Sequence, residues 1–181
     1  MGRKARIRKT VDFLDTSISP STDWATLNAL PSRERFRRIR NDSPWQDLAD
    51  RLLSLGGTTV YYRPEPYAAA LLRFGKRFRS TNTLVIPGLP NRCHENAATY
   101  WLQHRKEAVI VMGWALTRDD AWRQHTWVWR QSDGQWVESG VRRELGFGML
   151  LTDPEAKSVC LSQAPDAFAA FLMAPKSPSV P

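Results

Sequence analysis

The chain has 181 residues, of which 42% are hydrophobic and eight are tryptophan; this composition suits one domain with a buried core and excludes a wholly disordered protein. The formal net charge is +8, and the whole excess lies in residues 1–79, which hold 16 Lys+Arg against 8 Asp+Glu. Two cysteines exclude a disulfide framework, no stretch reaches the roughly 18 apolar residues of a membrane span, and residues 1–10 lack the apolar run of a secretory signal, so we expect a cytoplasmic protein without a membrane span.

The basic first part of the chain divides into a tail and a helical region. Residues 1–23 carry no periodic apolar face, so we expect a flexible basic tail, and residues 24–80 are expected to form a basic, helical N-terminal region. In that region we expect helices at 31–40, 45–55 and 67–78 and a short strand at 58–62. The first of these helices would present a group of arginines: Arg33, Arg35, Arg37, Arg38 and Arg40.

The second part of the chain, residues 81–174, reads as a compact core, followed by a tail at 175–181 that we expect to be disordered. An extended segment or strand at 83–86 leads into the rigid turn Pro87–Pro90, and a helix capped by Asn91 then runs from Cys93 to about His104. The remaining predictions are strands at 108–116, 123–130 and 135–139, further β structure at 145–152, and a helix at 165–173. The predicted fold class is α+β, an antiparallel sheet with packed helices.

Three residues in this core have the types and order of a cysteine hydrolase site. Cys93 begins a helix, where the positive end of the helix dipole favours a thiolate. His125 lies on a strand that could face Cys93, and Glu138 lies on the returning strand of a hairpin that turns at residues 132–134. A thiolate, an imidazole and a carboxylate that orients the imidazole are the groups that this chemistry needs. We therefore interpret Cys93, His125 and Glu138 as a candidate catalytic triad.

These motifs resemble the core of transglutaminase-like proteins, within the papain-like cysteine hydrolase superfamily. The resemblance rests on Cys93, on His125-Thr126-Trp127-Val128 and on Gly134-Gln135-Trp136-Val137-Glu138. It implies that residues 81–174 form a transglutaminase-like catalytic core. It also implies that Cys93 attacks an amide or ester carbonyl, that His125 moves the proton and that Glu138 holds His125. The implied activity is that of a hydrolase or acyltransferase, a protease, amidase or deamidase with a protein or peptide substrate and no cofactor.

The sequence departs from the family pattern at three points, one of which is the unusual His94 directly after Cys93. The family's third residue is usually Asp and lies slightly farther past the tryptophan, so Ser139 is an alternative to Glu138. No glutamine stands a few residues before Cys93, so the backbone N–H of Cys93, with Gln124 or Trp122, would have to stabilise the oxyanion. Trp127 is either a core residue or part of an acyl pocket.

Two other interpretations of these residues and of the basic charge need to be considered. Cys93, His94 and His125 are potential metal ligands, but the chain has three histidines and no Cys-x-x-Cys pair, so we expect no zinc site. The second interpretation is a non-catalytic binding module, in which the arginine-rich first half holds nucleic acid or an acidic protein. A solvated, solubilising face explains the same charge.

Overall fold

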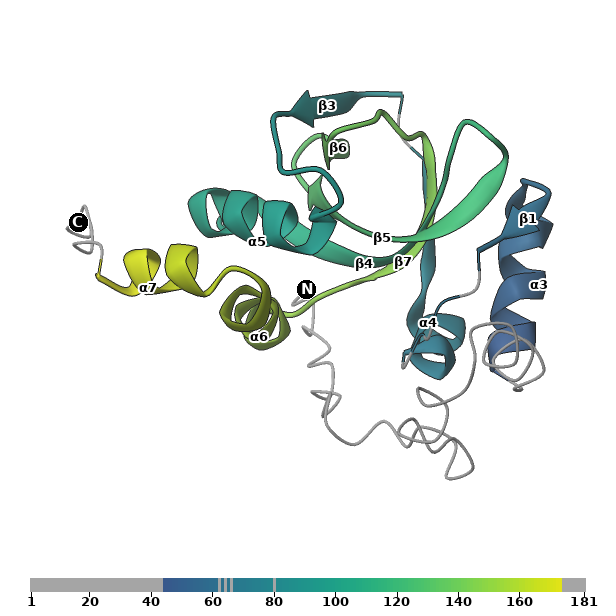
Figure 1. Ribbon diagram of the computed structural model, residues 1–181, viewed down its shortest axis with the longest axis horizontal. Helices are drawn as coiled ribbons and strands as arrows, with labels where there is room; N and C mark the ends of the chain where they lie inside the picture. Colours follow the sequence, from purple (N-terminus) through teal and green to yellow (C-terminus); the bar gives the residue numbers. More distant parts are fainter. Residues whose placement is uncertain (1–43, 62, 64, 66, 80, 174–181) are drawn as a thin grey trace, which may run out of the picture.

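The computed structural model describes residues 44–61, 63, 65, 67–79 and 81–173. These residues form a mixed α+β fold in which helices lie along the outside of a strongly curled sheet, away from β3 (Figure 1). The expected tails at 1–23 and 175–181, the predicted helix at 31–40 and the five arginines from Arg33 to Arg40 all lie outside the described residues. In the part that is described, no helix is long and apolar enough to cross a membrane.

Along the described chain, short helices and strands are mixed up to residue 104, four consecutive strands follow, and two helices come last. The helices are α3 (Trp45–Leu55), α4 (Ala68–Phe74), α5 (Cys93–His104), α6 (Asp153–Gln163) and α7 (Pro165–Met173). The strands are β1 (Thr59–Val60), β2 (Lys76–Arg79), β3 (Thr83–Ile86), β4 (Ala108–Leu116), β5 (Ala121–Arg130), β6 (Gln135–Ser139) and β7 (Leu145–Leu150).

The strands form one sheet in the order β2-β7-β4-β5-β6-β3, and β1 pairs with β5 off this path. Most pairs are antiparallel, while β1 runs parallel to β5 and β3 runs parallel to β6. The β5–β6 hairpin turns through Gly134, whose positive φ of 64° favours glycine. The predicted α+β class with a mainly antiparallel sheet is therefore confirmed.

The two faces of the sheet are packed differently, as the alternation of β4 makes clear. On the outer face, Ile110 packs with α5 and α6, and Trp114 packs with α3 and α4. On the inner face, Val111 and Ala115 pack against Trp127 and Trp136. The helices thus cover the outer face in two groups, and tryptophans fill the concave face.

Stacked tryptophans need room on the concave face, and two glycines of β7 supply it. The rings of Trp127 and Trp136 stack with their centroids 4.6 Å apart. A Cβ atom at Gly146 would lie 2.7 Å from the Trp136 ring, and one at Gly148 would lie 2.9 Å from the Trp127 ring. Because real Cβ atoms are not found that close to a ring, side chains at these positions would displace the tryptophans.

Two expectations about local structure were wrong, and one helix was not predicted. The predicted helix 67–78 ends at Phe74, and Lys76–Arg79 instead form β2 against β7. Asn91 does not cap α5: it has a φ of 60°, and Arg92 occupies the N-cap position without a side-chain cap. Residues 153–163, for which no element was predicted, form α6, with a capping box between Thr152 and Glu155.

The structure also bears on the expected boundary at residue 80. Residues on both sides of it belong to one sheet, since β2 pairs with β7 and β1 pairs with β5. Leu48 and Leu52 of α3 are fully buried in the same cluster as Trp114 and Phe147. The described part of the N-terminal region is therefore integral to the fold that holds the candidate site.

Candidate functional site

The candidate nucleophile, Cys93, is the first residue of α5 and directly follows a turn that begins at Leu89. The side chain of Asn96 holds this turn, because its Oδ1 accepts from Leu89 N at 2.9 Å and its Nδ2 donates to Leu89 O at 2.9 Å. The same Nδ2 donates to Ser139 Oγ at 3.0 Å. A side chain at Gly88 would collide with Asn96 and Ser139, with a Cβ atom 2.8 Å from each. Asn96 therefore fixes the start of α5 against the end of β6.

The side chain of His125 lies at a break in the pairing of β5. One edge of β5 pairs with β4 along its length, whereas the other pairs with β1 at residues 121–122 and with β6 at residues 128–130. Between these points, residues 123–127 pair with β4 on the first edge but with no described strand on the second edge. The N-terminus of α5 lies beside His125 at this break, and the Cys93 and His125 side chains are near enough for each to shift the pKa of the other.

Glu138 holds the His125 ring from β6. His125 Nε2 lies 2.9 Å from Oε1 and 2.8 Å from Oε2 of Glu138, and both side chains are almost fully buried. A nitrogen that faces a carboxylate carries the hydrogen, so Nε2 is the donor and Nδ1 is the nitrogen left for Cys93. The sequence left Glu138 and Ser139 as alternatives. Glu138 faces the ring, whereas the Ser139 hydroxyl bonds Asn96.

Three further groups surround the Glu138 carboxylate. The Trp136 indole donates to Oε2 at 3.3 Å, the Ser139 backbone donates to Oε1 at 2.9 Å, and Arg143 Nη1 lies 3.1 Å from Oε2. Every one of these groups is a hydrogen-bond donor, as a charged carboxylate requires. Burial without such partners would be very costly for a charge, so the partners explain how Glu138 remains at 1% exposure.

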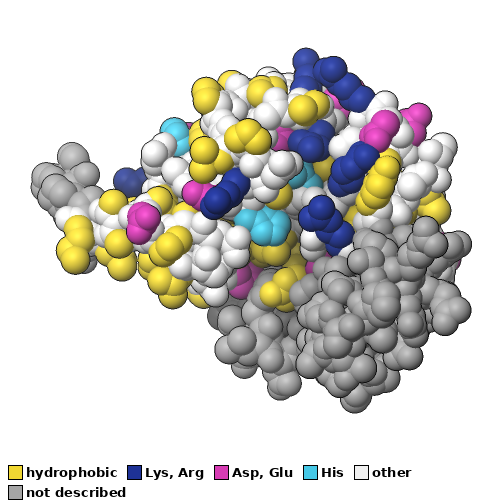
Figure 2. Space-filling model, in the orientation of Figure 1, with side chains coloured by type: hydrophobic (Ala, Val, Ile, Leu, Met, Phe, Trp, Pro, Cys, Tyr) yellow, Lys and Arg dark blue, Asp and Glu magenta, His cyan; other side chains and the backbone are white. Residues whose placement is uncertain are grey.

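The electrostatics of the cleft favour a thiolate at Cys93. Burial raises the pKa of the Cys93 thiol, but hydrogen bonds to His125 and His94, together with their charges, lower it from 9.0 to about 5. Burial lowers the pKa of His125, whereas hydrogen bonds to Cys93 and Glu138 and the charge of Glu138 raise it, and the net direction is upward. Figure 2 shows several Lys and Arg side chains near the histidine in the middle of this face. The pair therefore favours thiolate and imidazolium near neutral pH.

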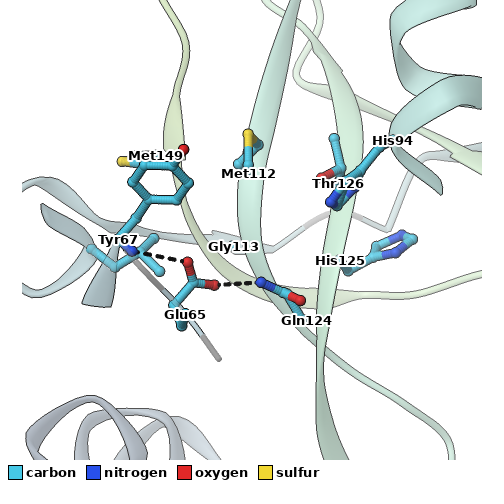
Figure 3. Close-up of a pocket in the computed structure, with 10 residues that line it drawn as sticks. Glu65, Tyr67, His94, Met112, Gly113, Gln124, His125, Thr126 and Met149 are labelled. Carbon is cyan, nitrogen blue, oxygen red and sulfur yellow. Dashed lines mark hydrogen bonds between the residues drawn. The ribbon is translucent and has the colours of Figure 1, made fainter. Parts of the chain in front are cut away.

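The second histidine of the cleft, His94, lies beside the sulfur and lines a small pocket (Figure 3). Its Nδ1 is 3.5 Å from Cys93 Sγ. Across the pocket, Gln124 Nε2 donates to the buried Glu65 Oε2 at 2.9 Å, and Tyr67 N donates to Glu65 Oε1 at 3.2 Å. Burial raises the pKa of Glu65 above its usual value, although these hydrogen bonds oppose the shift. One of the two hydrogens of Gln124 Nε2 is thus committed to Glu65.

The two tryptophans nominated for the substrate pocket occupy other positions. Trp122 is fully buried in the cluster with α3 and α4, and its indole donates to Gly56 O at 2.6 Å, so it has no free N–H for an oxyanion. Trp127 is 1% exposed and stacks between Trp136 and the His125 ring, whose centroid is 6.1 Å away. Trp127 therefore supports His125 from the core.

Sequence reasoning missed two residues of the site, Arg143 and Glu65. The side chain of Arg143 is 17% exposed and contacts Glu138. Glu65 is 4% exposed, and its partner Gln124 lies 59 residues farther along the chain. Neither residue has a local motif that could have signalled its role, because both act through contacts that form in the fold.

Among the described residues, no group of three or more His, Cys, Asp or Glu side chains is arranged to hold a metal ion. Comparison of the chain with protein-family models, with curated proteins and with solved structures finds no match. The geometry of the cleft is therefore the main guide to function.

Proposed function

We propose that the protein is a cysteine-dependent hydrolase or acyltransferase with a transglutaminase-like core, acting on an amide or ester bond of a protein or peptide. The observation that carries the proposal is the combination of the 2.8 Å contact between His125 Nε2 and Glu138 with a Cys93 pKa lowered to about 5. A structural cysteine has no need of an oriented imidazole. A nucleophile does, because the thiolate is the reactive form.

The first step would form a thioester. The Cys93 thiolate attacks the carbonyl carbon, and the carbonyl electron pair moves onto oxygen to give a tetrahedral oxyanion. When the carbonyl re-forms, the bond to the leaving amine or alkoxide breaks, and the His125 imidazolium gives its proton to that group. Glu138 holds the ring throughout, so that one imidazole nitrogen points at the reacting atoms.

The second step would release the acyl group. Neutral His125 takes a proton from water or an amine, which attacks the thioester carbonyl and expels the Cys93 thiolate. Both tetrahedral intermediates need hydrogen-bond donors for the oxyanion. The first N–H groups of a helix have no partner within the helix, so the N-terminus of the 12-residue α5, at Cys93, supplies donors beside the sulfur. Gln124 is a second candidate donor through its other Nε2 hydrogen.

The test is alkylation of the full chain with iodoacetamide between pH 4 and pH 10, with the modified cysteine identified by mass spectrometry. We expect Cys93 to react with a rate that rises near pH 5, because the thiolate forms there. An ordinary thiol would instead show its rise near the usual pKa of about 8.5. Turnover of p-nitrophenyl acetate by the same samples reports the complete cycle of acylation and deacylation.

The chain offers a matched control in its other cysteine. Cys93→Ser is expected to abolish both alkylation and ester turnover, whereas Cys160→Ser, which changes a cysteine that is fully buried, leaves both intact. Circular dichroism of both variants checks the fold. A wild-type rate that rises only near pH 8.5, or equal ester turnover by wild type and Cys93→Ser, would contradict the proposal.

A further inference from the structure

The fourth charged group of the site is Arg143, which lies just before β7. Its Nη1 is 3.1 Å from Glu138 Oε2, and the two side chains are 17% and 0% exposed. We propose that Arg143 is a positioning residue of the Cys93–His125–Glu138 site, which holds the Glu138 carboxylate and divides its charge between a guanidinium and the His125 imidazole. This inference rests on the proposed function and identifies a part of the site that the resemblance does not include.

The guanidinium is itself held in place by neighbouring backbone. Arg143 Nη1 donates to Val141 O at 3.1 Å, and the backbone carbonyl of Arg143 accepts from Thr83 Oγ1 at 3.0 Å. Thr83 begins β3, which runs parallel to β6 with Val85 opposite Glu138. The chain around Arg143 is thus tied to the strand that flanks Glu138. A tied guanidinium loses less conformational entropy in making an ion pair than a free surface side chain does.

The charges of the site form an alternating row. In the reactive form, the Cys93 thiolate is negative and the His125 imidazolium beside it is positive. The Glu138 carboxylate is negative, and the Arg143 guanidinium at the end of the row is positive. Without Arg143 the row would hold a net negative charge in a cleft where His125 is 5% exposed and Glu138 is 1% exposed. Buried charges need balanced partners, so Arg143 makes the row neutral.

This balance affects how firmly His125 holds its proton. Cys93 and Glu138 raise the pKa of His125, and the charge of Arg143 lowers it. Other titratable groups near the ring are His94 of α5 and Glu65, which line the same small pocket. An imidazolium that holds its proton too strongly is a poor acid toward a leaving group, because proton transfer is most effective when the pKa of the acid lies near the working pH. Arg143 keeps His125 closer to that range.

The test compares two neighbouring arginines. Arg143→Gln and Arg143→Met both remove the buried charge, and Arg142→Gln is the matched control, because the Arg142 side chain is 45% exposed and pairs with Glu144 instead. For each variant, ¹⁵N-histidine spectra follow the His125 imidazole as the pH rises; the chain has three histidines, so His125→Gln assigns the signal. The pH profile of Cys93 alkylation provides a second readout.

We expect Arg143→Gln and Arg143→Met to raise the midpoint of the His125 titration by about one pH unit. This is the effect of losing one partly screened positive charge a few ångströms from the ring. The upper limb of the alkylation profile should move with it. Arg142→Gln should match the wild type, and Arg143→Lys should return the titration toward the wild-type value, because it restores the charge. If one neutral variant fails to fold, the other carries the test.

Two results would overturn the proposal: a His125 titration in the neutral variants that superimposes on the wild type, or a lysine variant that shifts as far as Arg143→Gln. The histidine titration needs no catalysis. A wild-type protein whose Cys93 does not react would therefore contradict the proposed function, while the titration would still decide the role of Arg143.

Discussion

Cys93 is the first residue of α5 and Cys160 contacts that helix from α6, but the two thiols have opposite electrostatic surroundings. Cys93 starts α5 between two imidazoles, and its pKa is lowered to about 5. Cys160 lies in α6 with its Sγ 3.8 Å from the Ala98 carbonyl oxygen of α5, and burial raises its pKa to about 11. The residue type is the same and both side chains are largely removed from water. The difference teaches that partners that can carry positive charge, and not burial, decide which thiol becomes a nucleophile.

The largest change in the reactivity of Cys93 is expected from removing the imidazole that Glu138 holds. His125→Gln should raise the Cys93 pKa toward its ordinary value and lower ester turnover by about 10³-fold, because it removes the proton carrier as well as the charge. Alkylation at pH 6 should fall less, on the order of tenfold, since the thiolate that remains is intrinsically more nucleophilic. Turnover within a fewfold of wild type would show that His125 does not carry the proton.

The next effect should come from the residue that orients the ring. Glu138→Gln keeps the size of the side chain but lacks the charge that holds the Nε2–H tautomer, so we expect ester turnover to fall by about 10²-fold or more. Ser139→Ala is the comparison one residue farther along β6: it removes the hydroxyl that bonds Asn96 but leaves the Glu138 carboxylate in place, so we expect a smaller loss of turnover than for Glu138→Gln. A larger loss for Ser139→Ala than for Glu138→Gln would reverse the assignment of the third residue.

A smaller effect is expected from the neighbouring imidazole. His94→Gln removes a group whose Nδ1 is 3.5 Å from Cys93 Sγ and which lowers the Cys93 pKa less than His125 does. Alkylation at pH 5 should therefore fall about threefold, with little change at pH 8, where the thiolate is formed in either protein. His104→Gln, which changes the other end of α5, is the control. Equal profiles for wild type and His94→Gln would remove His94 from the electrostatics of the cleft.

The smallest effect is a pH dependence of stability that distinguishes the two cysteines. The Cys93 pKa is depressed, so its contribution is lost as the pH falls through about 5; the His125 pKa is raised, so its contribution is lost as the pH rises through the raised value. Between about pH 5 and 6.5 the unfolded chain binds more protons than the folded pair, and stability should rise with pH. From 6.5 up to the raised pKa of His125 the two states bind equal numbers of protons, and the curve should be flat.

Urea unfolding of wild type and Cys93→Ala across this range measures the contribution of the pair. The difference in the free energy of unfolding should grow between about pH 5 and 6.5 and then stay level, whereas Cys160→Ala should differ from wild type by an amount that is constant below about pH 8. A difference for Cys93→Ala that does not vary with pH would mean that the folded protein does not hold the thiolate.

Local patterns in the sequence predicted most elements of the fold. The helices α3 and α5 have the predicted bounds, because each has a clear start or stop, with Pro44 and Gly56 around α3 and the rigid turn at 87–90 before α5. The β5–β6 hairpin follows from its turn at Gly134. The sequence could not predict β2, since Lys76–Arg79 becomes a strand only by pairing with β7. Its basic residues carry no strand periodicity of their own.

The candidate site was predictable in its types and order but not in its supports. Cys93, His125 and Glu138 are the residue types that the chemistry needs, so the sequence could nominate them. Arg143, Glu65 and Asn96 are common surface types, and what makes them significant is contact with partners far along the chain. Trp122 was misplaced because the face of β5 that meets α3 is decided by tertiary packing.

The bond between Asn96 and Ser139 has a consequence for motion. It joins Asn96, three residues after Cys93, to Ser139, the residue after Glu138. The two ends of the candidate triad are thus connected by a contact that does not involve the His125 ring. A sideways displacement of α5 would therefore draw the tip of β6 along with it. The reacting groups would travel together as a unit, and thermal motion would preserve their mutual spacing.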